Sequence, residues 1–119
     1  MNTAELGVYG ETLAVNFLKK KGLTILERNY RFKKNEVDII CLEVETIVIV
    51  EVKTRQTAEI GEPWRAVTRN KQKQIIQVAN HYLQSNQIDR ETRFDIVSIV
   101  HNSYRTDIEY IPDAFYPLR

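Results

Sequence analysis

The stretch EVDIICLEVETIVIVEVK, residues 36–53, contains two apolar runs with charged residues at their ends. The runs Glu36–Glu43 and Thr46–Thr54 are rich in Val and Ile, which favour β-strands. The two-residue link between them predicts an antiparallel hairpin, although neither residue of the link is typical of a tight turn. Because residues 47–50 are all apolar, we expect the second strand to lie in the centre of a sheet, buried on both faces.

Helices are predicted on either side of this hairpin. Over residues 4–21 apolar side chains recur at helical spacing, and Gly22 follows as a typical helix terminator. A second helix is predicted from Pro63, which suits a first helical turn, to about Ser85. Further strands are expected at residues 23–32, 93–100 and 104–111.

The predicted order of elements is αβββαβ(β), which is typical of an α/β protein. We expect a mixed central sheet of about five strands with helices on both faces, arranged as one domain over residues 1–119. The last strand, from Tyr104 to Ile111, is expected at the edge of the sheet. Pro112 and Pro117 are expected to end regular structure beyond it.

The composition narrows the class of protein. Hydrophobic residues make up 43% and charged residues 28%, which is typical of globular proteins, and a net charge of +1 indicates no particular partner. A single cysteine, Cys41, excludes an internal disulfide and fits a reducing compartment. No apolar run approaches the roughly 20 residues that span a membrane, and the N-terminus lacks the features of a signal peptide. We therefore expect a cytoplasmic protein without membrane association.

Charged residues at the strand ends form a candidate site. Glu51 and Lys53 share one face of their strand, because side chains alternate between the two faces. In a hairpin closed at residues 44–45, Asp38 would lie opposite Glu51 on the same face. Two carboxylates ~4 Å apart repel each other by about 4 kcal/mol at an effective dielectric constant near 20. A positive charge is therefore expected between them.

A divalent cation would satisfy this requirement. Asp38, Glu51 and the backbone carbonyl of Val52 offer the oxygen ligands that Mg²⁺ or Mn²⁺ prefers. Lys53 would lie beside the cation and contact a phosphate and the attacking water. These groups are the parts that phosphodiester hydrolysis needs. The alternative is a structural hairpin in which Glu51 and Lys53 form a salt bridge, or one with both of its ends solvated.

Glu11 is a further candidate ligand on the first predicted helix. The small residues Gly7, Gly10 and Ala14 would allow that helix to approach the sheet closely. Glu11 could then reach the cation as a third carboxylate. The alternative is a solvated glutamate on the helix surface.

Basic residues follow the proposed site in the sequence. Arg55 comes directly after the strand, and the start of the second predicted helix carries Arg65, Arg69, Lys71 and Lys73 without an acidic residue among them. Such side chains, together with the N–H groups of a helix start, could bind DNA phosphates without reading the base sequence. The alternative for each of them is a solvated helix face.

Several longer motifs resemble a known family. Residues 7–31 (GVYGETLAVNFLKKKGLTILERNYR) are similar to its first helix and strand, and NEVDII with VIVEVKTR, residues 35–40 and 48–55, to its central signature. Residues 66–75 (AVTRNKQKQI) and 93–99 (RFDIVSI) match two further motifs. On these motifs the chain resembles the YraN-type family of small bacterial proteins, which is grouped with restriction-endonuclease-like and Holliday-junction-resolvase-like nucleases.

This resemblance implies a restriction-endonuclease-like fold and a nuclease-like site of Glu11, Asp38, Glu51 and Lys53. It implies DNA as the substrate, including branched or damaged duplexes, and a two-fold homodimer as the assembly. It also draws attention to three family-patterned residues without a defined role, namely Glu36, Lys71 and Asp95.

The sequence departs from the family pattern at two turns. Asn35 replaces a usual glycine, and the usual glycine-containing turn is absent at residues 43–46. Because asparagine tolerates left-handed backbone conformations, we expect the first turn to persist around Asn35. Two alternatives to a metal-dependent endonuclease stay open, a non-catalytic nucleic-acid-binding module and an interaction protein without a nucleic-acid role.

Overall fold

The computed structural model of the chain describes residues 1–57 and 67–116. Within these ranges the order of elements is αβββαββ, as the sequence predicts. The elements are α1 (Thr3–Lys20), β1 (Thr24–Phe32), β2 (Asn35–Glu43), β3 (Thr46–Arg55), α2 (Arg69–Ser85), β4 (Thr92–His101) and β5 (Thr106–Phe115).

The strands form a five-stranded mixed sheet in the order β1-β2-β3-β4-β5. β3 and β4 are parallel, and the other neighbouring pairs are antiparallel. The central position predicted for β3 is confirmed, since Val48 and Val50 are fully buried on one face and Ile47 and Ile49 are nearly so on the other. An apolar strand in the middle of a sheet is buried on both faces because a helix covers each side.

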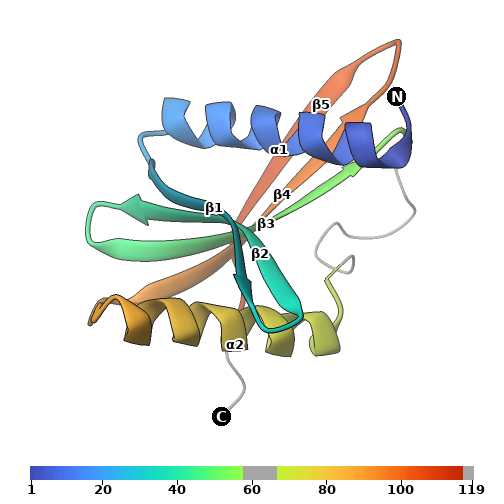
Figure 1. The fold of residues 1–119 in the computed structure, drawn as a ribbon. Helices are drawn as coiled ribbons and strands as arrows, with labels where there is room; N and C mark the ends of the chain where they lie inside the picture. The colour runs from blue at the N-terminus through green and yellow to red at the C-terminus, as the bar shows by residue number, and fades with distance from the viewer. Residues whose placement is uncertain (58–66, 117–119) are drawn as a thin grey trace.

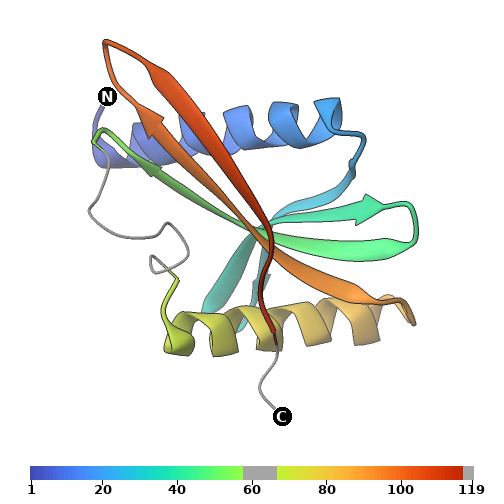
Figure 2. The same ribbon diagram turned by 180° about the vertical axis from the view of Figure 1, so that it is seen from behind.

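The two helices pack on opposite faces of the sheet (Figures 1 and 2). α1 lies over one apolar cluster and α2 over the other. The cluster beneath α1 contains Ala14, Leu18, Ile39, Cys41, Val48, Val50, Val97 and Ile99. The cluster beneath α2 contains Val37, Ile40, Ile47, Ile49, Ile75, Val78, Phe94 and Ile96.

Local sequence signals explain the ends of α1. Asn2 caps the helix, its side chain accepting the N–H of Glu5 while the Glu5 side chain accepts the N–H of Asn2. Gly22 follows the helix with a φ of +97°, a conformation that glycine adopts without steric cost. Between these ends Gly10 lies directly against Thr54 of β3, since an added Cβ would lie 1.8 Å from the Thr54 Oγ1 atom.

The second helix does not run unbroken from Pro63 to about Ser85 as predicted, because it is interrupted at Thr68. Thr68 adopts an extended conformation, and its side chain accepts the N–H of Lys71, so that α2 begins at Arg69. A threonine cap satisfies a free N–H group of the first turn and fixes the helix start at that position. The expected start at Pro63 lies outside the described residues.

The end of the last strand also differs from the prediction. Tyr104 lies in the turn before β5, is 94% exposed, and precedes a strand that continues through Pro112 to Phe115. The ladder between β4 and β5 shifts register opposite Asp95, where Asp113 has a φ of +55° and donates its N–H to the Asp95 carboxylate. A bulge on an edge strand tolerates a proline because no ladder hydrogen bond is needed there.

β2 pairs with β1 over a longer stretch than with β3. Its pairing with β3 runs from Glu43 opposite Thr46 to Ile39 opposite Val50, whereas its pairing with β1 continues to Asn35 opposite Phe32. β2 and β3 therefore separate at Asp38, and the β1–β2 hairpin extends beyond this point toward α2 (Figure 1).

The hairpin turns on either side of β2 are formed by residues that are not typical of turns. Val44, between β2 and β3, has a φ of +55° and is 88% exposed. Lys33, between β1 and β2, has a φ of +58°, whereas Asn35 already belongs to β2 and pairs with Phe32. The turn before Glu36 persists as expected, but its left-handed residue is Lys33 and not Asn35.

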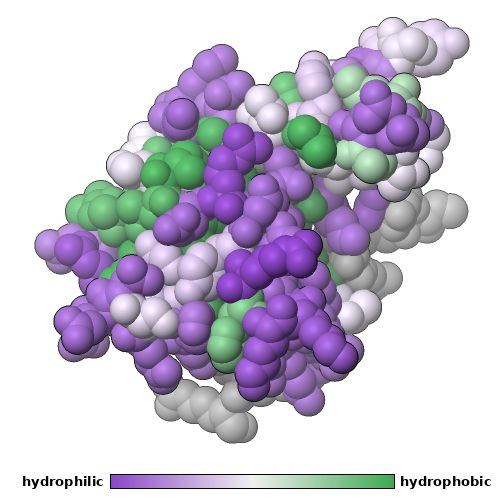
Figure 3. All heavy atoms as spheres, viewed as in Figure 1, coloured by the Kyte–Doolittle hydropathy of each residue, from purple (hydrophilic) through white to green (hydrophobic). Residues whose placement is uncertain are grey.

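The surface is largely hydrophilic over α2, while hydrophobic side chains gather at the left of the face in Figure 3, near the start of β1 and the β2–β3 turn. Val44 and Leu26 are exposed hydrophobic residues of this region. Among the described residues no helix is long and apolar enough to cross a membrane.

Candidate active site

Asp38 and Glu51 lie at the point where β2 and β3 separate. The next step of the ladder after Ile39 and Val50 would bring them opposite each other, as the sequence-based register expected. Glu51 is only 6% exposed, and the two carboxyl groups are hydrogen-bonded to each other. Asp38 Oδ2 also accepts the backbone N–H of Val52 at 2.8 Å. The carboxylate pair, as we call Asp38 and Glu51, is therefore held by both strands.

Burial is the main cause that raises the pKa of Asp38 to about 8. The hydrogen bond with Glu51 and the repulsion between the two carboxylates raise it further, while the Val52 N–H and the positive charge of Lys71 lower it. Half-buried Asp38 and buried Glu51 thus share a site that has too little positive charge for both to ionise. This donor set fits a divalent cation bound by oxygen, which would neutralise both groups.

Lys71, not Lys53, is the ammonium group in contact with the pair. Lys71 lies in the first turn of α2, and its Nζ atom is 3.6 Å from Glu51 Oε2. Lys53 is half-buried on the same face of β3 as Glu51, and forms no hydrogen bond or ion pair with the rest of the described chain. The alternative of a Glu51–Lys53 salt bridge is therefore not observed.

Glu11 reaches the edge of the site from α1. Its carboxylate accepts a 2.6 Å hydrogen bond from the Asn29 side chain, and its pKa is raised mainly by burial and also by the charge of Asp38. Asn29 lies within β1 and has a φ of +52°. In residues 1–57 and 67–116, no three His, Cys, Asp or Glu side chains are close enough together to hold a metal ion. Glu11 thus lies near the pair but is bonded to Asn29.

One of the basic residues proposed for DNA binding, Lys71, contacts the carboxylate pair. Arg69 and Lys73 are exposed at the start of α2, on either side of Lys71. Arg55 is half-buried at the end of β3. Arg65 lies outside the described residues. The contact between Lys71 and Glu51 places the start of α2 next to the carboxylate pair.

Asp95, by contrast, belongs to a structural network. It is fully buried, and it accepts hydrogen bonds from Arg93 Nε at 2.9 Å, from Arg93 Nη2 at 3.0 Å and from the Tyr110 hydroxyl. Arg93 also bonds Glu43 at 2.9 Å, and the hydrogen bond with Asp95 is the main cause that raises its pKa. Glu36, the other residue drawn from the resemblance, forms a 3.1 Å salt bridge with Arg31.

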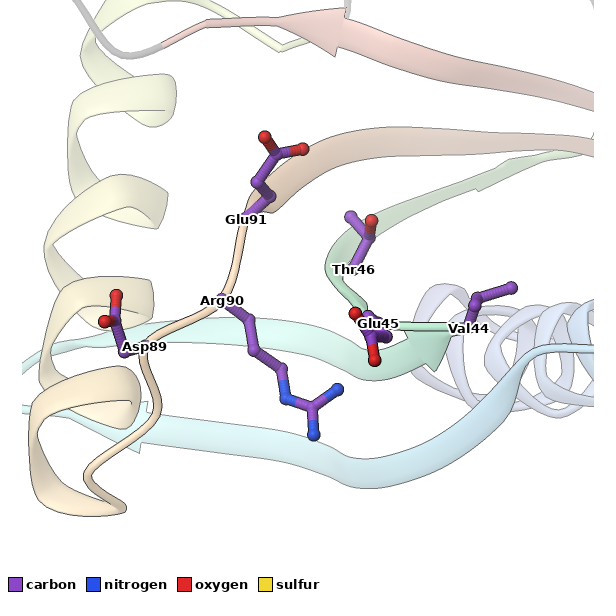
Figure 4. A pocket seen from close by; sticks show the side chains of 6 residues that line it. All are labelled: Val44, Glu45, Thr46, Asp89, Arg90 and Glu91. Atoms are coloured by element: carbon purple, nitrogen blue, oxygen red, sulfur yellow. The ribbon is translucent and has the colours of Figure 1, made fainter.

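A pocket of about 690 Å³ lies at the opposite end of β3 from Glu51. It is lined by Val44, Glu45, Thr46, Asp89, Arg90 and Glu91. Figure 4 shows that its acidic side chains point in different directions rather than toward a common centre. We therefore place the candidate active site at the carboxylate pair and not in this pocket.

Sequence reasoning missed two partners of the site residues. Lys71 was expected only to bind DNA, and Asn29 was not considered as a partner of Glu11. Both contacts join elements that are distant in the sequence, with separations of 20 and 18 residues. The sequence offered a signal only for the left-handed backbone of Asn29, because asparagine is enriched among residues with a positive φ.

The mixed five-stranded sheet, with a helix on each face and the order αβββαββ, is compatible with the restriction-endonuclease-like fold. Residues 10–99 match the uncharacterised protein family UPF0102, and the chain belongs to this family. The resemblance to the YraN-type family is thereby confirmed.

Relatives from several organisms carry the same family name. A UPF0102 protein of Christiangramia forsetii is 46% identical over 112 residues, which cover 94% of each chain. A UPF0102 protein of Caldicellulosiruptor saccharolyticus is 46% identical over 118 residues, covering 97% of this chain and all of the relative. A UPF0102 protein of Geobacter metallireducens is 43% identical over 116 residues, covering 97% and 95%.

Proposed function

We propose that the protein is a metal-dependent endonuclease-like enzyme that hydrolyses DNA phosphodiester bonds, including those of branched or damaged DNA. The observation that carries the proposal is the carboxylate pair. Buried Glu51 and half-buried Asp38 lie side by side next to the basic start of α2, and the pKa of Asp38 is raised to about 8 by burial and by its neighbour. Such an arrangement weakens the fold unless a cation or a proton occupies it.

Asp38 and Glu51 would hold the cation, together with the carbonyl of Val52, and Glu11 would assist from α1. A bound Mg²⁺ or Mn²⁺ would activate a water molecule and neutralise charge on the phosphate oxygens. Glu11 would need to release Asn29, since their 2.6 Å hydrogen bond occupies one carboxylate oxygen.

Lys53 is suited to contact the scissile phosphate. It lies two residues from Glu51 on the same strand face, a separation of about 6.6 Å along a strand. Its ammonium group has no competing ion pair in the described part of the chain, so it is available to a negatively charged substrate. Exposed Arg69 and Lys73 on α2 would hold flanking phosphates and position the DNA.

The test combines metal binding with cleavage. Wild type, Asp38→Asn and Glu51→Gln are titrated with Mn²⁺ by calorimetry and assayed on linear, single-stranded and four-way DNA, with and without chelator. We expect wild type to bind Mn²⁺ and to cut DNA only without chelator, and both variants to lose binding and cleavage. Cleavage by either variant, or in the presence of chelator, would contradict the proposal.

A non-catalytic nucleic-acid-binding module is the second candidate. It is favoured by the hydrogen bond of Glu11 to Asn29, which keeps the third carboxylate away from the pair in this structure. This candidate predicts that Asp38→Asn leaves DNA affinity unchanged and that wild type does not bind Mn²⁺. The same titration therefore distinguishes the two functions.

A further inference from the structure

The contact between Lys71 and Glu51 differs from an ordinary buried salt bridge. The Lys71 side chain is 42% exposed, whereas the Glu51 side chain is 7% exposed. Their separation of 3.6 Å exceeds the usual hydrogen-bond length, so the two groups attract each other as charges without a tight bond. The ammonium group thus approaches the buried carboxylate from the solvent side and can withdraw without crossing the core.

The chemistry of lysine makes this withdrawal easy. Its ammonium group is a compact charge on a flexible stem and is readily hydrated, unlike the planar guanidinium of arginine. Ion pairs are weakened where solvent reaches one partner, as it reaches the Lys71 side chain here. A divalent cation at the carboxylate pair would bring two charges close to Glu51 and would repel the ammonium group.

We propose that Lys71 is the exchangeable cation of the carboxylate pair. In the metal-free protein its ammonium group neutralises Glu51. When Asp38 and Glu51 bind a divalent cation, Lys71 is released and binds a phosphate of the DNA. This inference rests on the proposed function, and it makes metal binding and DNA binding reinforce each other through one side chain.

The first test measures metal affinity without DNA. Calorimetry with Mn²⁺ is performed on wild type, Lys71→Met and Lys71→Gln, with circular dichroism to confirm that each variant is folded. Removing the competing ammonium should raise Mn²⁺ affinity by about fivefold, the factor that corresponds to a partly exposed ion pair. Lys20→Met at the end of α1 makes the same change in net charge away from the site, and should leave the affinity unchanged.

The second test measures the coupling to DNA. Binding of a fluorescent phosphorothioate duplex, which resists cleavage, is followed by anisotropy with saturating Mn²⁺ and with chelator. Mn²⁺ should raise the DNA affinity of wild type about fivefold more than that of Lys71→Met, because coupling free energies are reciprocal. Lys73→Met, which alters an exposed neighbour on the same helix, should weaken DNA binding equally in both conditions.

The outcomes separate this inference from the proposed function. If wild type binds Mn²⁺ but Lys71→Met and Lys71→Gln bind it no more tightly, the exchange is refuted and the metal site stands. If Mn²⁺ enhances DNA binding equally in wild type and Lys71→Met, the release to phosphate is refuted. If wild type does not bind Mn²⁺, the proposed function fails as well.

Discussion

The sheet buries carboxylates in two places, and their surroundings differ. Asp95 between β4 and β5 receives hydrogen bonds from a guanidinium, a hydroxyl and a backbone N–H, and is fully buried. The pair of Asp38 and Glu51 between β2 and β3 has one backbone N–H, a mutual hydrogen bond and an ammonium group at 3.6 Å.

The difference shows what burial of an acid indicates. A buried carboxylate with well-placed charged donors stabilises the fold in the geometry that it holds. A buried pair with too few donors weakens the fold and is typical of a functional site. The positively charged partner also differs between the two places. An arginine contacts Asp95, and a lysine contacts Glu51.

Arg93→Met should produce the largest effect. It would leave Asp95 buried without its charged partner, and removal of one partner from a buried pair costs about 3–5 kcal/mol. Lys71→Met is the matched change at the other site and should cost less than about 1 kcal/mol, since its ammonium is partly exposed. Urea denaturation of both variants measures the contrast, and equal losses would show that the two sites are alike.

Gly10→Ala should have the next largest effect, and it tests whether the carboxylate pair depends on α1. The added Cβ would lie 1.8 Å from Thr54 Oγ1, so the helix beside Glu11 must move away, at a cost of about 2 kcal/mol. Mn²⁺ affinity should fall as well.

Gly7→Ala is the control on the same helix. No atom lies within 4 Å of its added Cβ, so it should stabilise the helix by up to about 1 kcal/mol. Thermal unfolding of both variants is the measurement. Similar shifts of Tm in the same direction would refute the close contact between α1 and β3.

Asp38→Asn should stabilise the metal-free protein by about 1 kcal/mol at pH 8, because it removes the repulsion with Glu51 while keeping an acceptor for the Val52 N–H. The equivalent change Asp95→Asn should destabilise, since it weakens the bonds to Arg93. Denaturant unfolding of the two variants should therefore give shifts of opposite sign.

The gain in Asp38→Asn should also depend on pH. The folded-state pKa of Asp38 is about 8, against a usual value of 3.8. Between these values the folded protein binds more protons at this group than the unfolded chain does. The wild type therefore loses stability as the pH rises through this window. The advantage of Asp38→Asn should grow from about pH 4 to about pH 8 and then remain constant. An advantage that shrinks with rising pH would contradict the environment assigned to the pair.

The sequence was sufficient to predict the strands and the residues that face each other across them. Alternation and hairpin length predicted that Asp38 lies opposite Glu51, because strand geometry fixes the facing residues once the turn is placed. The roles of Lys71 and Asp95 could not be predicted, since they depend on how α2 and β5 pack onto the sheet. The end of β5 was predicted wrongly at Pro112. A strand can continue through a proline at an edge position and a bulge, and only the assembled sheet defines these.

Substitution of Asn29 should have the smallest effect on stability. It tests whether Glu11 binds a cation together with the carboxylate pair or has a structural role, as Asp95 does. Its amide donates to Glu11 at 2.6 Å and lowers the pKa of that carboxyl against the effect of burial, while its backbone has a φ of +52°. Asn29→Gly removes the amide and keeps the conformation, whereas Asn29→Ala also strains the backbone by about 1 kcal/mol. Titration of Glu11 by NMR should show a higher pKa in both variants, and Asn29→Ala should unfold at the lower temperature.

If Glu11 then binds Mn²⁺ with the pair, the Mn²⁺ affinity should rise in Asn29→Gly, because the carboxylate no longer has to break a hydrogen bond. An unchanged affinity would place Glu11 with the structural acids, beside Asp95.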